Sequence, residues 1–119
     1  MQLRKRLVIK TTGKVLGKIT SAEYGMVSDY PFLFGLQLRF KLSDGTSIGC
    51  GSRYTENISE SCKWTTAERQ YGITMCVDKI YQILQDAKVN YVSQLVNKPV
   101  EVVIEKNTFK DFRILTEVL

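Results

Sequence analysis

Hydrophobic and polar residues alternate along several short segments of the chain, a pattern typical of strands with one buried face. The alternation is strictest over residues 35–42, where Leu36, Leu38, Phe40 and Leu42 occupy every second position. Ser43-Asp44-Gly45-Thr46 follows, and Asp-Gly tolerates the positive φ angles of a type I′ hairpin turn. A returning strand is therefore predicted over residues 46–54.

Weaker patterns predict four more strands. They cover residues 2–10, 15–22, 100–106 and 112–118. Over residues 15–22, the period of two places Val15, Gly17, Ile19 and Ser21 on one face.

The clearest helical signal begins at Thr65. Thr65-Thr66-Ala67-Glu68 fits a capping box, in which the Thr65 hydroxyl and the Glu68 carboxylate each accept from a backbone amide at the helix start. Apolar residues then follow at spacings of three and four, on one stripe formed by Ile73, Val77, Ile80, Leu84 and Ala87. We predict a helix over residues 65–87, and a short helical turn over 90–95 capped by Asn90.

Runs of strands around one long helix favour an α+β fold. We predict a mostly antiparallel sheet of about six strands with the long helix packed on one face. The chain has 119 residues and no internal repeat or linker, so residues 1–119 are expected to form a single domain.

Residue types absent from the chain exclude several kinds of site. There is no histidine, which removes the Ser-His-Asp and Cys-His routes to an activated nucleophile. The cysteines number three, which suits reduced thiols better than a disulfide framework or a four-ligand zinc site. We expect a protein that is not an enzyme and needs no metal or cofactor.

Hydrophobic runs in the sequence are short. None approaches the ~18–20 residues of a membrane span, and Leu7-Val8-Ile9 is shorter than a signal-peptide core of about 7–15 residues. The sequence therefore predicts a cytoplasmic protein without a membrane partner.

Positive charge is concentrated at the N-terminus. The net charge is +5, yet none of the 12 acids lies in the first 20 residues. Such a patch can steer an anionic partner, nucleic acid included, or can serve only as a solvated sheet face. Its cations are Arg4, Lys5, Arg6, Lys10, Lys14 and Lys18.

A Gly-rich segment before the helix is the first candidate binding site. Glycine weakens a strand unless a backbone or a ligand must come close, and here small, polar, cationic and aromatic residues occur together. Such a set could bind a phosphorylated or nucleobase ligand. A bulge followed by an ordinary surface loop is the alternative. The candidate residues are Gly49, Gly51, Ser52, Arg53, Tyr54, Lys63 and Trp64.

The second candidate site is residues 23–35, predicted as a long connection between strands. Exposed apolar side chains often mark a contact surface for a protein partner. The alternative is that these side chains fold back over an open sheet edge. The candidate partner-binding residues are Tyr24, Met26, Tyr30, Phe32 and Phe34.

The last 40 residues or so carry a family resemblance. The stretches that carry it are Ile-Tyr-Gln-Ile-Leu from Ile80, Ala87-Lys88-Val89, Leu95-Val96-Asn97-Lys98-Pro99-Val100-Glu101-Val102, and Arg113 to Leu119. The chain resembles small accessory proteins encoded by bacteriophages and prophages, in which a helix and a short turn similarly lead to an L-x-G-K-x-V strand entry. Many of those have glycine where this chain has Asn97, a residue that also tolerates positive φ.

The resemblance implies an accessory protein that acts in the cytoplasm of a bacterial host. Together with the Gly-rich segment, it predicts a counter-defence protein that sequesters an anionic, nucleotide-like host ligand. One alternative is an inhibitor that docks on a host defence protein or protein–nucleic-acid complex through residues 24–34. Direct nucleic-acid binding by the basic N-terminal strands is a further alternative. The sequence also allows the chain to form a homo-oligomer.

Overall fold

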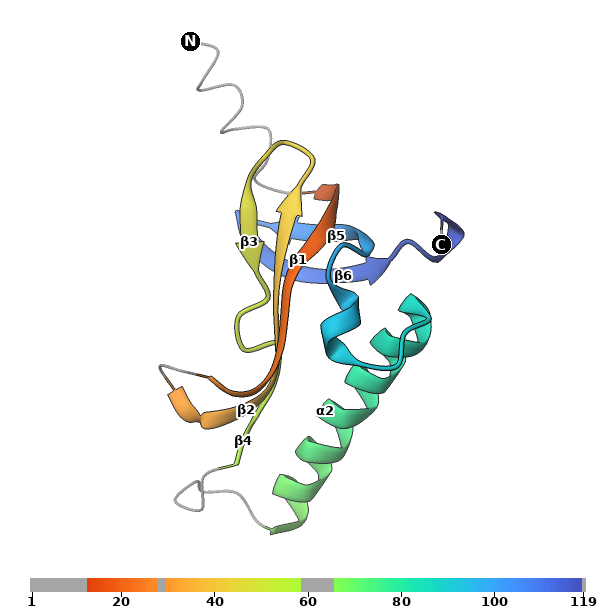
Figure 1. Cartoon of the computed structure of the whole chain (residues 1–119). Coiled ribbons are helices and arrows are strands. Elements are labelled where there is room, and N and C mark those ends of the chain that lie inside the picture. Colours follow the sequence, from red (N-terminus) through yellow and green to blue (C-terminus); the bar gives the residue numbers. More distant parts are fainter. Residues whose placement is uncertain (1–12, 28–29, 59–65, 119) are drawn as a thin grey trace.

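A computed structural model describes residues 13–27, 30–58 and 66–118 of the protein. For residues 30–32 it describes the backbone alone. The predicted strand over residues 2–10 lies outside the described residues. The α+β class is confirmed: a six-stranded antiparallel sheet is accompanied by one long helix along one side (Figure 1). The strand order is β3-β2-β1-β5-β6, with β4 also paired to β2. The elements are β1 (Gly13–Val27), β2 (Tyr30–Leu42), β3 (Ser47–Gly49), β4 (Tyr54–Asn57), α2 (Thr66–Ala87), η1 (Val92–Leu95), β5 (Pro99–Glu105), β6 (Thr108–Ile114) and η2 (Thr116–Val118).

A long hairpin of β1 and β2 dominates the sheet. The prediction that residues 23–35 form a connection is wrong, because the two strands stay paired as far as Val27 and Tyr30. Gly35 lies in this hairpin: its φ is +155°, and a Cβ there would collide with the backbone of Tyr54 and Thr55. The absence of a side chain lets β4 lie tightly against the distal half of β2.

The strand returning from β2 is interrupted. β3 pairs with Arg39–Lys41 and β4 with Leu33–Leu36, so both lie along the same edge of β2. Between them the chain turns at Cys50, where the Arg53 amide donates to the Cys50 carbonyl at 3.3 Å. The Gly-rich segment is therefore a turn inserted into an edge strand, and the predicted continuous strand over residues 46–54 is wrong in its middle.

The tight hairpin turn with two residues of positive φ joins β5 to β6, and not β2 to β3 as expected. At Asp44-Gly45 only Gly45 has positive φ, so this turn is not of type I′ as predicted. Lys106 and Asn107 both have positive φ and join β5 directly to β6. The last strand consequently starts at Thr108 rather than Phe112 and ends at Ile114, before η2.

The core lies between the sheet and α2. The alternating strand behaves as predicted: Leu36, Leu38, Phe40 and Leu42 are all buried. On α2, Ile80 and Ala87 are buried, but Val77 is 49% exposed, which contradicts its place on the predicted stripe. The helix crosses β4 and β6 instead of lying along the long strands, so its contact face is narrow.

Close packing of α2 on β4 depends on Gly72. A Cβ at that position would lie 2.5 Å from the Glu56 carboxylate of β4. Nearby, the Cys76 thiol donates to the Tyr54 carbonyl at 3.1 Å. Gly72 and Cys76 thus bring the first half of the helix onto the short strand.

The short turn after the helix forms as predicted, but its cap differs. The Gln94 side chain accepts from the backbone amides of Asn90 and Tyr91, at 3.0 and 2.9 Å, so Asn90 is not the capping side chain. Asn97 has a φ of +74°, the conformation expected for it.

Candidate functional site

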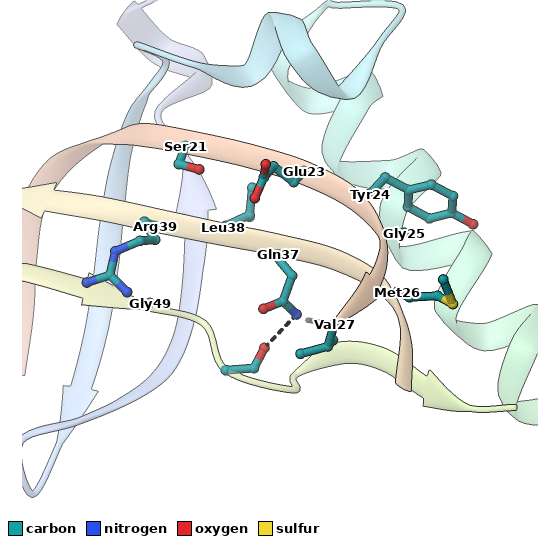
Figure 2. A pocket seen from close by; sticks show the side chains of 11 residues that line it. Ser21, Glu23, Tyr24, Gly25, Met26, Val27, Gln37, Leu38, Arg39 and Gly49 are labelled. Atoms are coloured by element: carbon teal, nitrogen blue, oxygen red, sulfur yellow. Dashed lines mark hydrogen bonds between the residues drawn. The ribbon is translucent and has the colours of Figure 1, made fainter. Parts of the chain in front are cut away.

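A hollow of about 610 Å³ lies on the face of the β1–β2 hairpin that is turned away from the core (Figure 2). Its floor is formed by the two long strands, and one side is formed by β3 and the Gly-rich turn. The residues that line it are Ser21, Glu23, Tyr24, Gly25, Met26, Val27, Gln37, Leu38, Arg39, Gly49 and Gly51.

The polar side chains of Ser21 and Glu23 reach this hollow because of a β-bulge in β1. The pairing shifts between Ile19 and Ser21, since Ile19 lies opposite Phe40 but Ser21 lies opposite Arg39. The extra residue, Thr20, donates from its hydroxyl to the Arg39 carbonyl at 3.3 Å. Ser21 therefore faces outward, and the prediction that it shares a face with Ile19 is wrong.

Two cross-strand pairs supply the chemistry of the hollow. Ser21 lies opposite Arg39, and Glu23 lies opposite Gln37. Within the described part of the chain, neither the Arg39 guanidinium nor the Glu23 carboxylate has a hydrogen bond or an ion pair. Figure 2 shows both side chains on the same side of the hairpin. A cation and an anion on neighbouring strands are thus available to a ligand.

Glycines shape the wall beside Arg39. Gly49 is the cross-strand partner of Arg39, and a Cβ on it would lie 3.1 Å from the Arg39 Nη1 atom. The Gln37 side-chain amide donates to the Gly51 carbonyl at 3.2 Å and so ties the turn to the floor (Figure 2). This wall leaves room for the guanidinium because it lacks side chains.

The predicted ligand-binding residues separate into three groups. Gly49 and Gly51 line the hollow, whereas Ser52 and Arg53 are exposed on the turn and do not line it. Tyr54 is only 5% exposed and does not line the hollow. The remaining two candidates, Lys63 and Trp64, lie outside the described residues.

Tyr54 instead belongs to the core. Its ring packs edge-on against Phe109 and Phe112, and its hydroxyl lies 3.4 Å from the Asp111 carboxylate, to which it donates. Burial, and then the adjacent Asp111 charge, raises the pKa of Tyr54 well above the ordinary tyrosine value. Its role is to fasten β4 to β6.

The predicted partner-binding residues lie at the distal end of the hairpin. Tyr24 is 50% exposed and Met26 is 68% exposed. Figure 2 shows both at one end of the hollow, directed away from Arg39. The Tyr24 ring meets the half-buried Phe34 edge-on, with centroids 5.1 Å apart. The side chains of Tyr30 and Phe32 are not described.

Of the predicted anion-steering residues, Lys14 and Lys18 are exposed on β1. The other four, Arg4, Lys5, Arg6 and Lys10, precede the described residues.

Sequence reasoning missed the four polar side chains of the hollow. Ser21, Glu23, Gln37 and Arg39 occupy the polar positions of half-buried strands, where solvated side chains are the ordinary case. One signal was present: Gln37 and Arg39 are the polar members of the strictest alternation in the chain. The register that brings them opposite Glu23 and Ser21 depends on the bulge, which no local pattern reveals.

The described residues contain no cluster of three or more Cys, Asp or Glu side chains that could bind a metal ion. They also contain no helix with the length and hydropathy needed to cross a membrane.

No protein-family model matches the chain, and comparisons with curated proteins and with solved structures found no match either.

Proposed function

We propose that this chain is a non-enzymatic binding protein that holds an anionic, nucleotide-like ligand in the hollow between β1, β2 and the Gly-rich turn. One observation carries the proposal: the Arg39 guanidinium lies in the hollow without a partner among the described residues, beside a wall of glycine. A guanidinium offers a planar fork of donors that matches two oxygens of a phosphate.

The other side chains fit the remaining parts of a nucleotide. The Glu23 carboxylate accepts hydrogen bonds, as required by ribose hydroxyls and by exocyclic amines of bases. Ser21 and Gln37 add neutral donors and acceptors. The glycines of the floor and wall, Gly25 and Gly49, allow a flat ring to approach the backbone.

The same proposal extends to a biological setting. The resemblance to bacteriophage accessory proteins supports a counter-defence role in the bacterial cytoplasm, in which the protein sequesters a host nucleotide. Binding alone is sufficient for this role, and the hollow contains no pair of groups positioned as nucleophile and base.

The experiment is a thermal-shift screen of the purified protein against mono-, di- and cyclic nucleotides, with native mass spectrometry for a co-purified ligand. A ligand at ~100 times its Kd adds about 2.7 kcal/mol to the free energy of unfolding. For a chain of this length, the melting temperature should rise by on the order of 10 °C. A flat response across the panel, with no bound mass, contradicts the proposal.

A second candidate function is docking on a host protein. The exposed Tyr24 and Met26 at the distal end of the hairpin favour it, because aromatic and Met side chains are enriched at interface cores. Its test is capture of a partner from bacterial lysate by the wild type and by the Tyr24→Ser/Met26→Ser variant. Equal capture by both, or capture of nothing, counts against this function.

A further inference from the structure

Beyond the hollow, the outer face of β1 and β2 continues as a row of cations. Lys18 of β1 lies directly opposite Lys41 of β2, and Lys14 lies on the same face of β1. All three side chains are exposed. Like charges directly opposite each other destabilise a pair of strands, so the Lys18–Lys41 pair lowers the stability of the sheet. A bound anion would remove this electrostatic repulsion.

The register places no carboxylate directly opposite these lysines. Lys18 pairs with Pro99 and Lys14 with Val103, while Glu101 lies beside Leu16. Glu101 is itself bound by Arg113 at 3.0 Å, an arginine that also bonds Glu117. Among the described residues, no carboxylate pairs with Lys14, Lys18 or Lys41.

A second, shallower hollow of about 370 Å³ lies at the Lys18–Lys41 pair. Besides the two lysines, its lining includes the Ser43 end of β2 and the exposed Leu16. Lys41 and Arg39 are two residues apart on one face of β2, which corresponds to about 7 Å along the strand. The two hollows are therefore neighbouring anion sites on one continuous surface.

We infer that the ligand of this surface is a short single strand of nucleic acid, with one phosphate at Arg39 and the next at Lys18 and Lys41. The inference rests on the proposed function and names the class of its ligand. A mononucleotide occupies the first hollow only and leaves the lysine pair unneutralised. A duplex keeps its bases stacked inside, whereas a single strand can place one base in the larger hollow and another on Leu16.

The experiment compares cytidine monophosphate with a cytidylate strand of about eight ribonucleotides, so that only the length of the anion differs. Affinity is measured at several salt concentrations for the wild type and for Lys18→Gln/Lys41→Gln. The matched control is Lys79→Gln/Lys88→Gln, which removes two charges from the helix side of the sheet. For single strands, the logarithm of affinity falls with the logarithm of salt with a slope of about −0.7 per neutralised phosphate.

We expect the wild type to bind the strand at least about tenfold more tightly than the monophosphate. One phosphate at Arg39 and one at the Lys18–Lys41 pair predict a salt slope of about −1.4, and the Lys18→Gln/Lys41→Gln variant should reduce it to about −0.7. The control variant should keep the wild-type slope. Monophosphate binding should be unchanged in both variants.

Two results overturn this inference while leaving the proposed function in place. One is equal affinity for the strand and the monophosphate. The other is a salt slope unaffected by Lys18→Gln/Lys41→Gln. Equally tight binding of polyglutamate with the same dependence on the two lysines would assign the surface to an acidic protein and overturn the nucleic-acid ligand. If the wild type binds neither cytidine probe, the inference is contradicted, and the proposed function is tested by the wider nucleotide panel.

Discussion

The Arg39 guanidinium lies over Gly49, its partner across β2 and β3, with Nη1 3.1 Å from where a Cβ would be. Gly49→Ala should therefore displace the Arg39 guanidinium from this position. Because the obstructed atom ends a flexible side chain, the free energy of unfolding should change by less than about 1 kcal/mol. Ligand affinity should fall, as measured by titration, while the unfolding curve stays near that of the wild type. Unchanged affinity would show that the ligand does not need Arg39 in this position.

The Tyr54–Asp111 contact predicts a loss of stability at alkaline pH. The pKa of Tyr54 is raised in the folded protein, so its protonated form is favoured there. Its contribution to stability is fully present below the ordinary tyrosine pKa of about 10, and is lost as the pH rises from there through the raised folded-state pKa. Urea unfolding from pH 8 to pH 11 should show a smaller alkaline loss for Tyr54→Phe than for the wild type.

The matched control for that series is Tyr71→Phe, which makes the same change at an exposed position on α2. Its curve should follow the wild type across the pH range. Parallel curves for the wild type and Tyr54→Phe would remove Tyr54 as the cause of the alkaline loss.

Gly72 and Glu56 should be coupled energetically. Replacing an exposed helix glycine with alanine ordinarily stabilises a protein by about 1 kcal/mol. Here the new Cβ meets the Glu56 carboxylate, so Gly72→Ala should stabilise less in the wild type than in a Glu56→Ala background. A double-mutant cycle by urea unfolding measures the difference. Additive effects would mean that the carboxylate moves aside without cost.

The core strand could be predicted from sequence because its information is local. From Leu36 to Leu42, each side chain follows the period of two, and the buried set is the one that the pattern indicates. The distal hairpin could not be predicted in this way. Its glycines, Gly25 and Gly35, look like loop residues, but they face each other in the sheet, and Gly35 is needed there because β4 comes so close.

The candidate site was partly visible in the sequence. Gly49 and Gly51 were identified as residues that leave room for a ligand, and they do line the hollow. The cation beside them was assigned to Arg53, the nearest in sequence, whereas the structure places Arg39 there. That exchange depends on the register of β2 with β3, which places Arg39 opposite Gly49, and on the turn at Cys50; both are properties of the folded sheet.

The most direct test of the proposed site compares Arg39→Gln with Arg53→Gln across the nucleotide panel. Each variant removes one guanidinium, one from inside the hollow and one from the turn outside it. Hydrogen bonds to a charged group contribute about 1.5–3 kcal/mol, so Arg39→Gln should weaken binding by roughly 10- to 100-fold. Arg53→Gln should bind as the wild type does. The reverse pattern, with binding lost in Arg53→Gln and kept in Arg39→Gln, would contradict the account and move the site to the turn.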